Sequence, residues 1–278
     1  VVVKVVLSRK GFDSSYGRTA SPILPDGTLL SFPIPSKTET LRFTDLHYNS
    51  WSYYDVIKAL RPATKIKEKY TCHLDPDIRK EVMPRTGVWQ PAFGQEGTAL
   101  SHLQNQGVGV GDLFLFYGWF RRTELSDGRL RYVQRAPDLH IIYGYLQIGD
   151  VITHEEDVPE WLVGHPHNTA ERWRRGLNAI YVASERLSIQ PELAGAGCLT
   201  MSERLVLTKK GCLRRVWDLP DFMRNVPITY NADAWQDEGF VSAARGQEFV
   251  FDANNDVIDW VKDMLLSGSR WNSPTAVI

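Results

Sequence analysis

The chain has 278 residues, 43% of them hydrophobic and 23% charged, which is typical of a globular protein with a sizeable core. Its formal net charge of −1 excludes a protein that binds polyanions through an overall basic field. Three cysteines, Cys72, Cys198 and Cys212, form no Cys-x-x-Cys pair, which favours free thiols in a reducing compartment. No run of about 18 apolar residues occurs, so we expect a cytoplasmic protein without a membrane span.

The first part of the chain is predicted to combine strands, turns and short helices. An apolar, β-branched run predicts a buried strand over residues 1–7. Asp26-Gly27 lies between two apolar pairs and predicts a hairpin turn. Apolar residues at helical spacing predict a helix over 45–60, and a second helix is predicted over 98–105.

The strongest β signal lies in the middle of the chain. Apolar runs separated by Gly-Asp and Ser-Asp-Gly turns predict a curled sheet or small barrel. The strands expected there are 113–117, 120–123, 129–134 and 139–148, the last closed by Gly149-Asp150. Further strands are predicted over 178–183 and 204–207, and an amphipathic helix over 257–266. Since no linker interrupts the chain, we expect one α+β domain over 1–278, with a mixed, β-rich core and flanking helices.

A polar loop with the sequence SRKGFDSS follows the first predicted strand. A loop at the carboxyl end of a core strand is a frequent ligand site. Arg9 and Lys10 could hold a phosphate there, and Asp13 could orient a hydroxyl group or act as a base. The alternative is an ordinary turn capped by Asp13 and Ser14. Neither GxxxxGK[ST] nor a GxGxxG in the right context occurs, so no P-loop is predicted.

A second polar segment, CHLDPD at 72–77, combines a thiol, an imidazole and two carboxylates. Such groups can bind a metal, and Asp75 is a candidate general base. In extended backbone Asp75 and Asp77 would lie on one face of the strand. The alternative is a proline-containing turn in which Asp77 caps a helix over 78–83.

His165 and His167 are separated by one proline, and imidazoles at this spacing can point the same way in extended backbone. Both are candidate ligands of a divalent metal ion, which would be a cofactor, and His167 is also a candidate for proton transfer. A further ligand would be required, for which Asp138 and His140 are candidates. The alternative is a loop with locally satisfied histidines.

Other polar residues are candidates for contacts with a nucleotide. The amide of Gln95 offers both a donor and an acceptor to a base edge. The nucleotide-binding set predicted in this way is Ser8, Arg9, Gln95, His102, Arg245 and Gln247. No GxSxG elbow, HExxH motif or zinc-deaminase signature occurs in the chain.

Several motifs together resemble the third type of nucleotide-modification-associated domain. They are SRKGFDSSYG, SPILPDGTLLSFPIP, CHLDPDI, GVGVGDLFLFYGWFR with PDLHIIYGYLQIGDVI, HPH with NAIYVA, and ARGQEFV. The resemblance spans nearly the whole chain and departs from the family pattern at Arg18-Thr19-Ala20, where smaller, Gly-rich residues are expected. That family is known from genomic association with systems that modify DNA bases or resist phage. The resemblance therefore implies a role near nucleotide or DNA modification, with proteins of such systems as partners, and it implies no particular reaction.

The resemblance also implies which polar positions belong to the family's motifs. They are Ser8, Lys10, Asp13, Ser21, Asp26, His73, Asp75, Asp77, Gln95, His102, Asp138, His140, His165, His167, Arg245 and Gln247. The GDLFLFYG and LQIGD segments are in addition similar to PUA-like barrels, several of which read modified bases or RNA. That likeness concerns the fold and carries little information on function.

Three functions are consistent with these patterns, and the sequence leaves open whether the protein is a catalyst. The first is an enzyme that binds a nucleotide or nucleic acid and acts on it through Lys10, Asp13, Asp75 and His167. The second is a non-catalytic reader of modified nucleic acid, whose stacking rings would be drawn from Trp89, Tyr117, Trp119 and Trp173. An arginine zone over 172–175 would contact the phosphates. The third is a scaffold subunit of a modification or defence complex, which would have an exposed apolar patch and no polar pocket.

Overall fold

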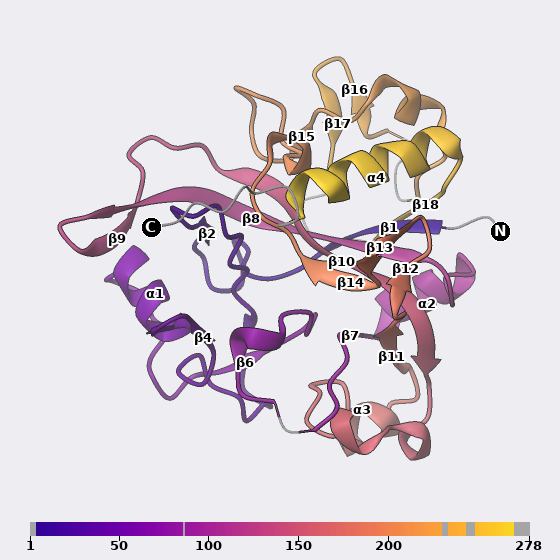
Figure 1. Cartoon of the computed structure of the whole chain (residues 1–278), viewed down its shortest axis with the longest axis horizontal. Coiled ribbons are helices and arrows are strands. Elements are labelled where there is room, and N and C mark those ends of the chain that lie inside the picture. Colours follow the sequence, from indigo (N-terminus) through magenta and orange to yellow (C-terminus); the bar gives the residue numbers. More distant parts are fainter. Residues whose placement is uncertain (1–3, 86, 230–232, 243–247, 270–278) are drawn as a thin grey trace.

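A mixed sheet of nine strands forms the centre of the computed structural model, which describes residues 4–85, 87–229, 233–242 and 248–269 (Figure 1). Its strands are β1 (Lys4–Arg9), β2 (Ser21–Ile23), β7 (Ala92–Glu96), β8 (Leu113–Ser126), β9 (Arg129–Tyr132), β10 (Leu139–Ile152), β11 (Asn178–Ala183), β14 (Ala196–Cys198) and β18 (Glu248–Asp252). The main path of paired strands is β18-β1-β8-β10-β11-β7. β2 and β9 pair with β8, and β14 pairs with β10.

Smaller elements surround this sheet. The α-helices are α1 (Tyr53–Leu60), α2 (Gly97–Asn105), α3 (Ala170–Arg174) and α4 (Asn255–Gly268). The 3-10 helices are η1 (Lys80–Val82), η2 (Glu155–Asp157), η3 (Glu160–Leu162), η4 (Glu203–Leu205) and η5 (Asp221–Asn225). The small sheets pair β3 (Ile34–Ser36) with β6 (Thr71–His73), β4 (His47–Tyr48) with β5 (Trp51–Ser52), β12 (Arg186–Leu187) with β13 (Gln190–Ala194), and β17 (Gly239–Val241) with β15 (Val216–Trp217) and β16 (Trp235–Gln236). This arrangement confirms the predicted α+β class.

β10 contains a bulge that bends the sheet. Its first part pairs with β8 and its last part with β11, and the register shifts between Ile148 and Asp150. Gly149 lies at this shift, where a Cβ atom would come within 2.7 Å of the Cα of Ser184. The predicted end of the strand at Gly149-Asp150 is therefore wrong. The residues that were expected to close the strand form a bulge instead, and β10 continues to Ile152.

The two ends of the strand path come together. Gln95 Nε2 of β7 donates to Glu248 Oε1 of β18 at 2.6 Å, although these strands end opposite edges of the path. Phe93 of β7 packs against Phe114 and Phe116 of β8, with ring centroids 4.9 and 5.1 Å apart. The sheet is thus curled, as predicted, and its end strands are linked by side chains. Between them the described residues contain no strand pairing that would close a barrel. The likeness to PUA-like barrels stays a prediction.

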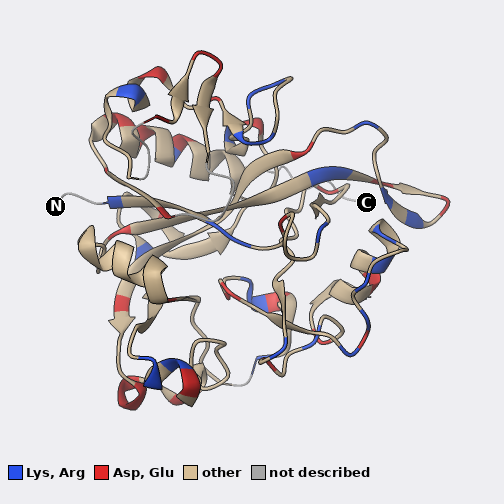
Figure 2. Cartoon of the chain, turned by 180° about the vertical axis from the view of Figure 1, so that it is seen from behind, with Lys and Arg blue, Asp and Glu red and all other residues tan. Residues whose placement is uncertain are grey.

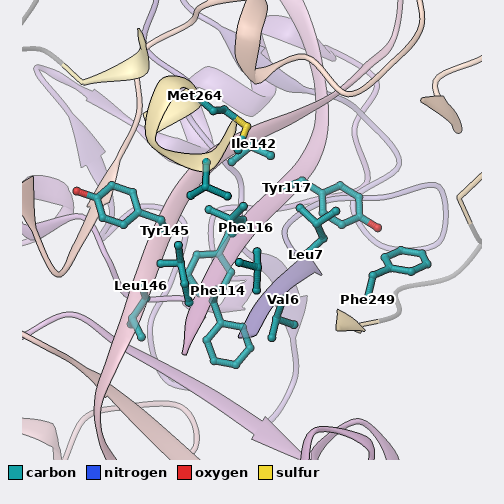
Figure 3. Close-up of a cluster of buried hydrophobic side chains, with 14 of the residues drawn as sticks. Val6, Leu7, Phe114, Phe116, Tyr117, Ile142, Tyr145, Leu146, Phe249 and Met264 are labelled. Carbon is teal, nitrogen blue, oxygen red and sulfur yellow. The ribbon is translucent and has the colours of Figure 1, made fainter. Parts of the chain in front are cut away.

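Both faces of β1 and β8 are buried in the core, which explains why these strands are apolar on both faces. Figure 3 shows Val6 and Leu7 of β1 beside aromatic residues of β8, and all of these side chains are buried. On one face Met264 of α4 lies close to Ile142 of β10 in the same view. A second cluster of buried residues lies around α1 and includes Phe32, Phe43, Tyr53 and Ile57.

Local sequence signals account for several differences between the predicted and observed elements. The helix expected over 45–60 begins only at Tyr53, because Ser52 and Asp55 form a capping box that fixes its first turn. The strand expected over 204–207 is wrong, since Ser202 caps the 3-10 helix η4 there. The second and the last predicted helices are confirmed as α2 and α4. Among the described helices, none has the length and apolar character needed to cross a membrane.

One ionisable group, His140 of β10, is buried inside this core. Its Nδ1 accepts a hydrogen bond from Trp217 Nε1 at 3.0 Å. Burial lowers the pKa of His140 well below its usual value, and the positive charges of Arg9 and Arg214 add to this effect. The folded protein therefore holds His140 in its neutral form at pH values where an unfolded chain takes up a proton.

We predict that His140 makes the protein less stable as the pH falls below 6.5. Between the folded pKa and the unfolded value near 6.5, the unfolded chain binds more protons, so the free energy of unfolding must fall with the pH. From pH 6.5 to 5.5 this amounts to about 1 kcal/mol for one group. Urea denaturation should show this loss to be about 1 kcal/mol smaller in His140→Asn, whose Oδ1 can still accept from Trp217. Equal losses in both proteins would contradict the prediction.

Candidate functional site

A pocket of about 370 Å³ lies at the carboxyl end of β1. Its walls come from the end of β1 and the loop after it, from β3, from the end of β6 and the loop after it, from β7, and from α3 and the segment before it. The lining residues are Arg9, Lys10, Gly11, Asp13, Tyr16, Ile34, Pro35, Ser36, His73, Asp75, Gly94, Gln95, Glu96, His167 and Arg172. Segments more than 150 residues apart in the chain thus supply titratable groups to one cavity.

Lys10 is fixed on one wall of this pocket. Its backbone N–H donates to Tyr117 O at 2.9 Å, which extends the pairing of β1 with β8 by one residue. The ammonium group lies 3.1 Å from Glu248 Oε1 and 4.4 Å from the centre of the Phe93 ring. Glu248, which is 5% exposed, therefore accepts from both Lys10 and Gln95. These contacts hold the cation in one orientation.

Asp75 lies on another wall, surrounded by three imidazoles. Its side chain is 4% exposed, and Oδ1 accepts from the backbone N–H of Gly94 at 2.7 Å. Oδ2 lies 4.0 Å from His73 Nε2 and 3.9 Å from His167 Nε2. His165 Nε2 lies 3.6 Å from Oδ1. Each ring nitrogen that approaches the carboxylate is an Nε2 atom.

Hydrogen bonds on the far side of the rings determine which nitrogen carries the proton. The amide N–H of Asn178 donates to His167 O, so Asn178 Oδ1 is an acceptor, and it lies 2.9 Å from His167 Nδ1. His73 Nδ1 lies 3.0 Å from Glu39 Oε1, again an acceptor. Both rings therefore carry the proton on Nδ1 and direct an unprotonated Nε2 towards Asp75.

Burial determines the charge state of this cluster. It raises the pKa of Asp75 to about 6, against the opposing charges of His73 and Lys10. It also lowers the pKa of His165 to about 3 and that of His167 well below the usual histidine value, with neighbouring histidines adding to the effect. At neutral pH the site therefore holds the Asp75 carboxylate beside the neutral rings of His165 and His167, with Lys10 as the nearby cation. A carboxyl group whose pKa is this close to neutrality can transfer protons.

Arginines complete the polar lining. Arg172 pairs with Glu39 at 3.4 Å and with Glu96 at 2.5 Å, and Arg9 lies 3.9 Å from Asp13. Arg172 thereby supports the carboxylate that holds His73. Elsewhere, Lys and Arg alternate with Asp and Glu over the elements seen in Figure 2, as expected for a chain with a net charge of −1.

The structure brings together most of the residues that the sequence singled out. Six of them line the pocket, namely Arg9, Lys10, Asp13, Asp75, Gln95 and His167, and His165 lies directly behind Asp75. Ser8 is buried in β1, and His102 lies on α2 with its Nε2 3.1 Å from Thr229 Oγ1, so neither lines the pocket. Arg245 and Gln247 lie outside the described residues.

Two pocket residues have local partners that limit their predicted roles. Asp13 Oδ1 accepts from the backbone N–H groups of Ser15 and Tyr16, which agrees with the alternative of a capped turn. The amide of Gln95 donates to Glu248 and accepts from the N–H of Glu96, so it is already engaged on both sides. Their roles as a base and as a reader of a base edge remain predictions.

Three expectations about partners are wrong. Asp77 does not share a face with Asp75, because its carboxylate binds Arg85 and the indole of Trp89. Nor does Asp77 cap a helix, since η1 begins at Lys80 after Arg79. Neither Asp138 nor His140 approaches the histidine pair, because they bind Arg121 and Trp217, respectively. His73 and Asp75 lie there instead.

Several important residues were absent from the predicted site. Glu39 and Asn178 orient the histidines through contacts that join distant parts of the chain, and no local sequence signal identifies them. Arg172, which pairs with Glu39, had a signal as part of the predicted arginine zone over 172–175. His73 had a signal, since it lies two residues before Asp75 in the same motif. Glu248 also had a signal, since it directly follows Gln247, a predicted nucleotide-binding residue.

Comparison of the sequence with models of protein families identifies the class to which the chain belongs. Residues 4–252 match the family described as nucleotide modification associated domain 3, and the chain therefore belongs to this family. The family's name associates it with nucleotide modification, as the motifs indicated. Searches of curated proteins and of solved structures found no significant match.

We predict that Gly94 is required for the packing of the cluster. A Cβ atom at this position would lie 2.1 Å from Cγ of His167, so Gly94→Ala must displace the imidazole or the strand. The free energy of unfolding should fall by about 1–3 kcal/mol, the usual cost of overpacking. Gly164→Ala is the matched control, because a Cβ there meets nothing within 4 Å. Urea denaturation of both variants tests this, and equal effects would contradict it.

Proposed function

We propose that the pocket binds a nucleotide, either free or as a unit of a nucleic acid, and acts on it through Lys10, Asp75 and His167. The observation that carries this proposal is the convergence of a fixed cation, a buried carboxylate of raised pKa and neutral imidazoles on one cavity. The volume of about 370 Å³ lies within the range of small-molecule sites. Membership of the family supports a role connected with nucleotides.

The cationic groups of the pocket suit a phosphate. Lys10 has three N–H donors, and Glu248 accepts from this ammonium group through a single oxygen. Arg9 and Arg172 lie on the same lining and offer planar guanidinium groups, which match phosphate geometry. We therefore assign the phosphate of the nucleotide to this part of the pocket.

A stacking surface for the base is present as well. Tyr16 lines the pocket and is 55% exposed. Aromatic rings stack on any base through their faces, so Tyr16 suits a base whose phosphate lies near Lys10. Two of the four rings predicted from the sequence are less suitable for stacking on a base. Tyr117 is buried in the core, and the guanidinium of Arg214 covers Trp119 at 4.1 Å.

The proton-transfer groups favour an enzyme over a scaffold. Asp75, with a pKa of about 6, suits a general base near neutral pH. His167 shares its wall and is held by Asn178. A scaffold would have no need of a polar cavity of this kind, whereas a reader would need the cations and the stacking ring and not the buried acid–base cluster.

We predict that Lys10→Gln and Arg172→Gln each weaken nucleotide binding by about tenfold, which is about 1.4 kcal/mol. Calorimetric titration with nucleoside monophosphates and a short single-stranded oligonucleotide, at 50 and 200 mM salt, measures this. Binding of the oligonucleotide should weaken at the higher salt concentration. Lys67→Gln, an exposed lysine outside the pocket, is the control and should bind normally. The proposal fails if the wild-type protein binds none of these ligands at low salt.

Catalysis is tested separately from binding. We expect Asp75→Asn, which keeps an acceptor for the N–H of Gly94, to retain nucleotide binding and to lose turnover. Mass spectrometry of nucleosides from cells that express either protein should show a modified nucleoside only with the wild type. Identical nucleoside profiles, together with normal binding, would favour a reader.

A further inference from the structure

We infer that His73, Asp75 and His167 bind a divalent transition-metal ion through His73 Nε2, Asp75 Oδ2 and His167 Nε2. One ligand atom from each of these residues lies within 4.8 Å of the other two. Two imidazole nitrogens and one carboxylate oxygen form a donor set that occurs in catalytic zinc and non-haem iron sites. The role of the ion as a cofactor rests on the proposed function, whereas the site itself is argued and tested without a nucleotide.

The contacts within the cluster are not hydrogen bonds. Both Nε2 atoms lie 3.9–4.0 Å from Asp75 Oδ2, beyond hydrogen-bonding distance. In the neutral form of both rings, with the proton on Nδ1, three lone pairs face one another with no proton between them. A cation among them would relieve this repulsion. Ligand atoms at about 2.1 Å from one ion lie about 3.4 Å apart, so small side-chain rotations suffice to close the site.

The surroundings of the cluster resemble the outer shell of a metal site. Ligating histidines typically donate the other ring N–H to a carboxylate or carbonyl oxygen, which fixes the ring and raises the basicity of the ligand. Glu39 is in this position for His73, and Asn178 for His167. Gly94 N–H occupies Oδ1 of Asp75, which leaves Oδ2 for the ion.

His165 lies behind the carboxylate of the cluster. Its side chain is 1% exposed, and among the described residues its Nε2 has no partner that meets hydrogen-bond geometry. Nδ1 accepts from the backbone N–H of His167 at 3.2 Å, so the neutral ring carries its proton on Nε2, which points at Asp75 Oδ1 from 3.6 Å. We therefore assign His165 to a positioning role, in which its Nε2–H faces Asp75 Oδ1 when the carboxylate moves towards the ion. The predicted pair of ligands is revised accordingly, with His73 and Asp75 joining His167.

The donor set also selects the class of metal. Imidazole nitrogens suit Zn²⁺, Fe²⁺ and related ions, whereas Mg²⁺ and Ca²⁺ prefer oxygen ligands throughout. All three ligand residues line the pocket, so an ion bound by them would border the cavity proposed for the substrate. It would occupy Asp75 Oδ2 and His167 Nε2, and it would supply Lewis acidity to a substrate oxygen or to water in place of the proton transfer proposed for these two groups in the metal-free pocket.

Titration of the chelator-treated protein with Zn²⁺, without any nucleotide, tests the inference. We expect one equivalent to bind, and we expect His73→Gln, Asp75→Asn and His167→Gln to weaken binding by at least about 100-fold. His165→Gln should weaken it by about tenfold, the effect typical of an outer partner. His154→Gln is the control, because this histidine is 65% exposed and lies outside the cluster.

A measurement on the wild-type protein guards against variants that fail to fold. In ¹⁵N-histidine NMR spectra, Zn²⁺ should shift the Nε2 resonances of His73 and His167 and leave His165 protonated at Nε2. Absence of stoichiometric binding, or unchanged resonances of these two rings, would overturn the inference. An equal loss in His154→Gln would do the same. Nucleotide binding by the zinc-free protein is scored separately, so the metal site can fail while the proposed function stands.

Discussion

The carboxylate of Glu248 holds the two ends of the curled sheet together, and the geometry of the pocket depends on this contact. Glu248 begins β18 at one end of the strand path, and it accepts from Lys10 beside it and from Gln95 on β7 at the other end. Hydrogen bonds to a buried charged acceptor are among the stronger ones in proteins. Because of this link, the cation after β1 and the histidines packed on β7 face the same cavity.

Strand pairing supplies the second half of the site. β11 pairs with β7 so that Asn178 lies opposite Glu96, and Asn178 in turn holds His167 over Gly94. Only a residue without a side chain leaves room for the imidazole there. β11 itself pairs with the last part of β10, across the bulge between Ile148 and Asp150, and bulges of this kind bend a strand.

The sequence predicted local features well and long-range geometry poorly. Apolar runs identify β8, β10 and β11, because burial on both faces leaves a clear signal, and polar segments at strand ends identify Lys10, Asp75 and His167. The capping box of Ser52 and Asp55 could have defined the start of α1. In contrast, the hydrogen bond between Gln95 and Glu248 joins residues 153 positions apart. The partner of His73 is Glu39, which lies in the segment after β3. The first contact joins the two ends of the curled sheet, and the second joins β6 to the segment after β3. No local pattern encodes which side chains meet in this way.

The curl has a consequence for how the protein responds to its ligand. A molecule that contacts both Lys10 and His167 links the segment after β1 to the histidine that packs on β7. It therefore adds a connection between parts of the sheet that no backbone pairing joins directly among the described residues. Any ligand that binds only the folded state stabilises it by RT ln(1 + [L]/Kd), where [L] is the free ligand concentration. Resistance to heat or proteolysis should therefore rise with the concentration of the ligand. Without a ligand, local opening should occur first between β1 and β7.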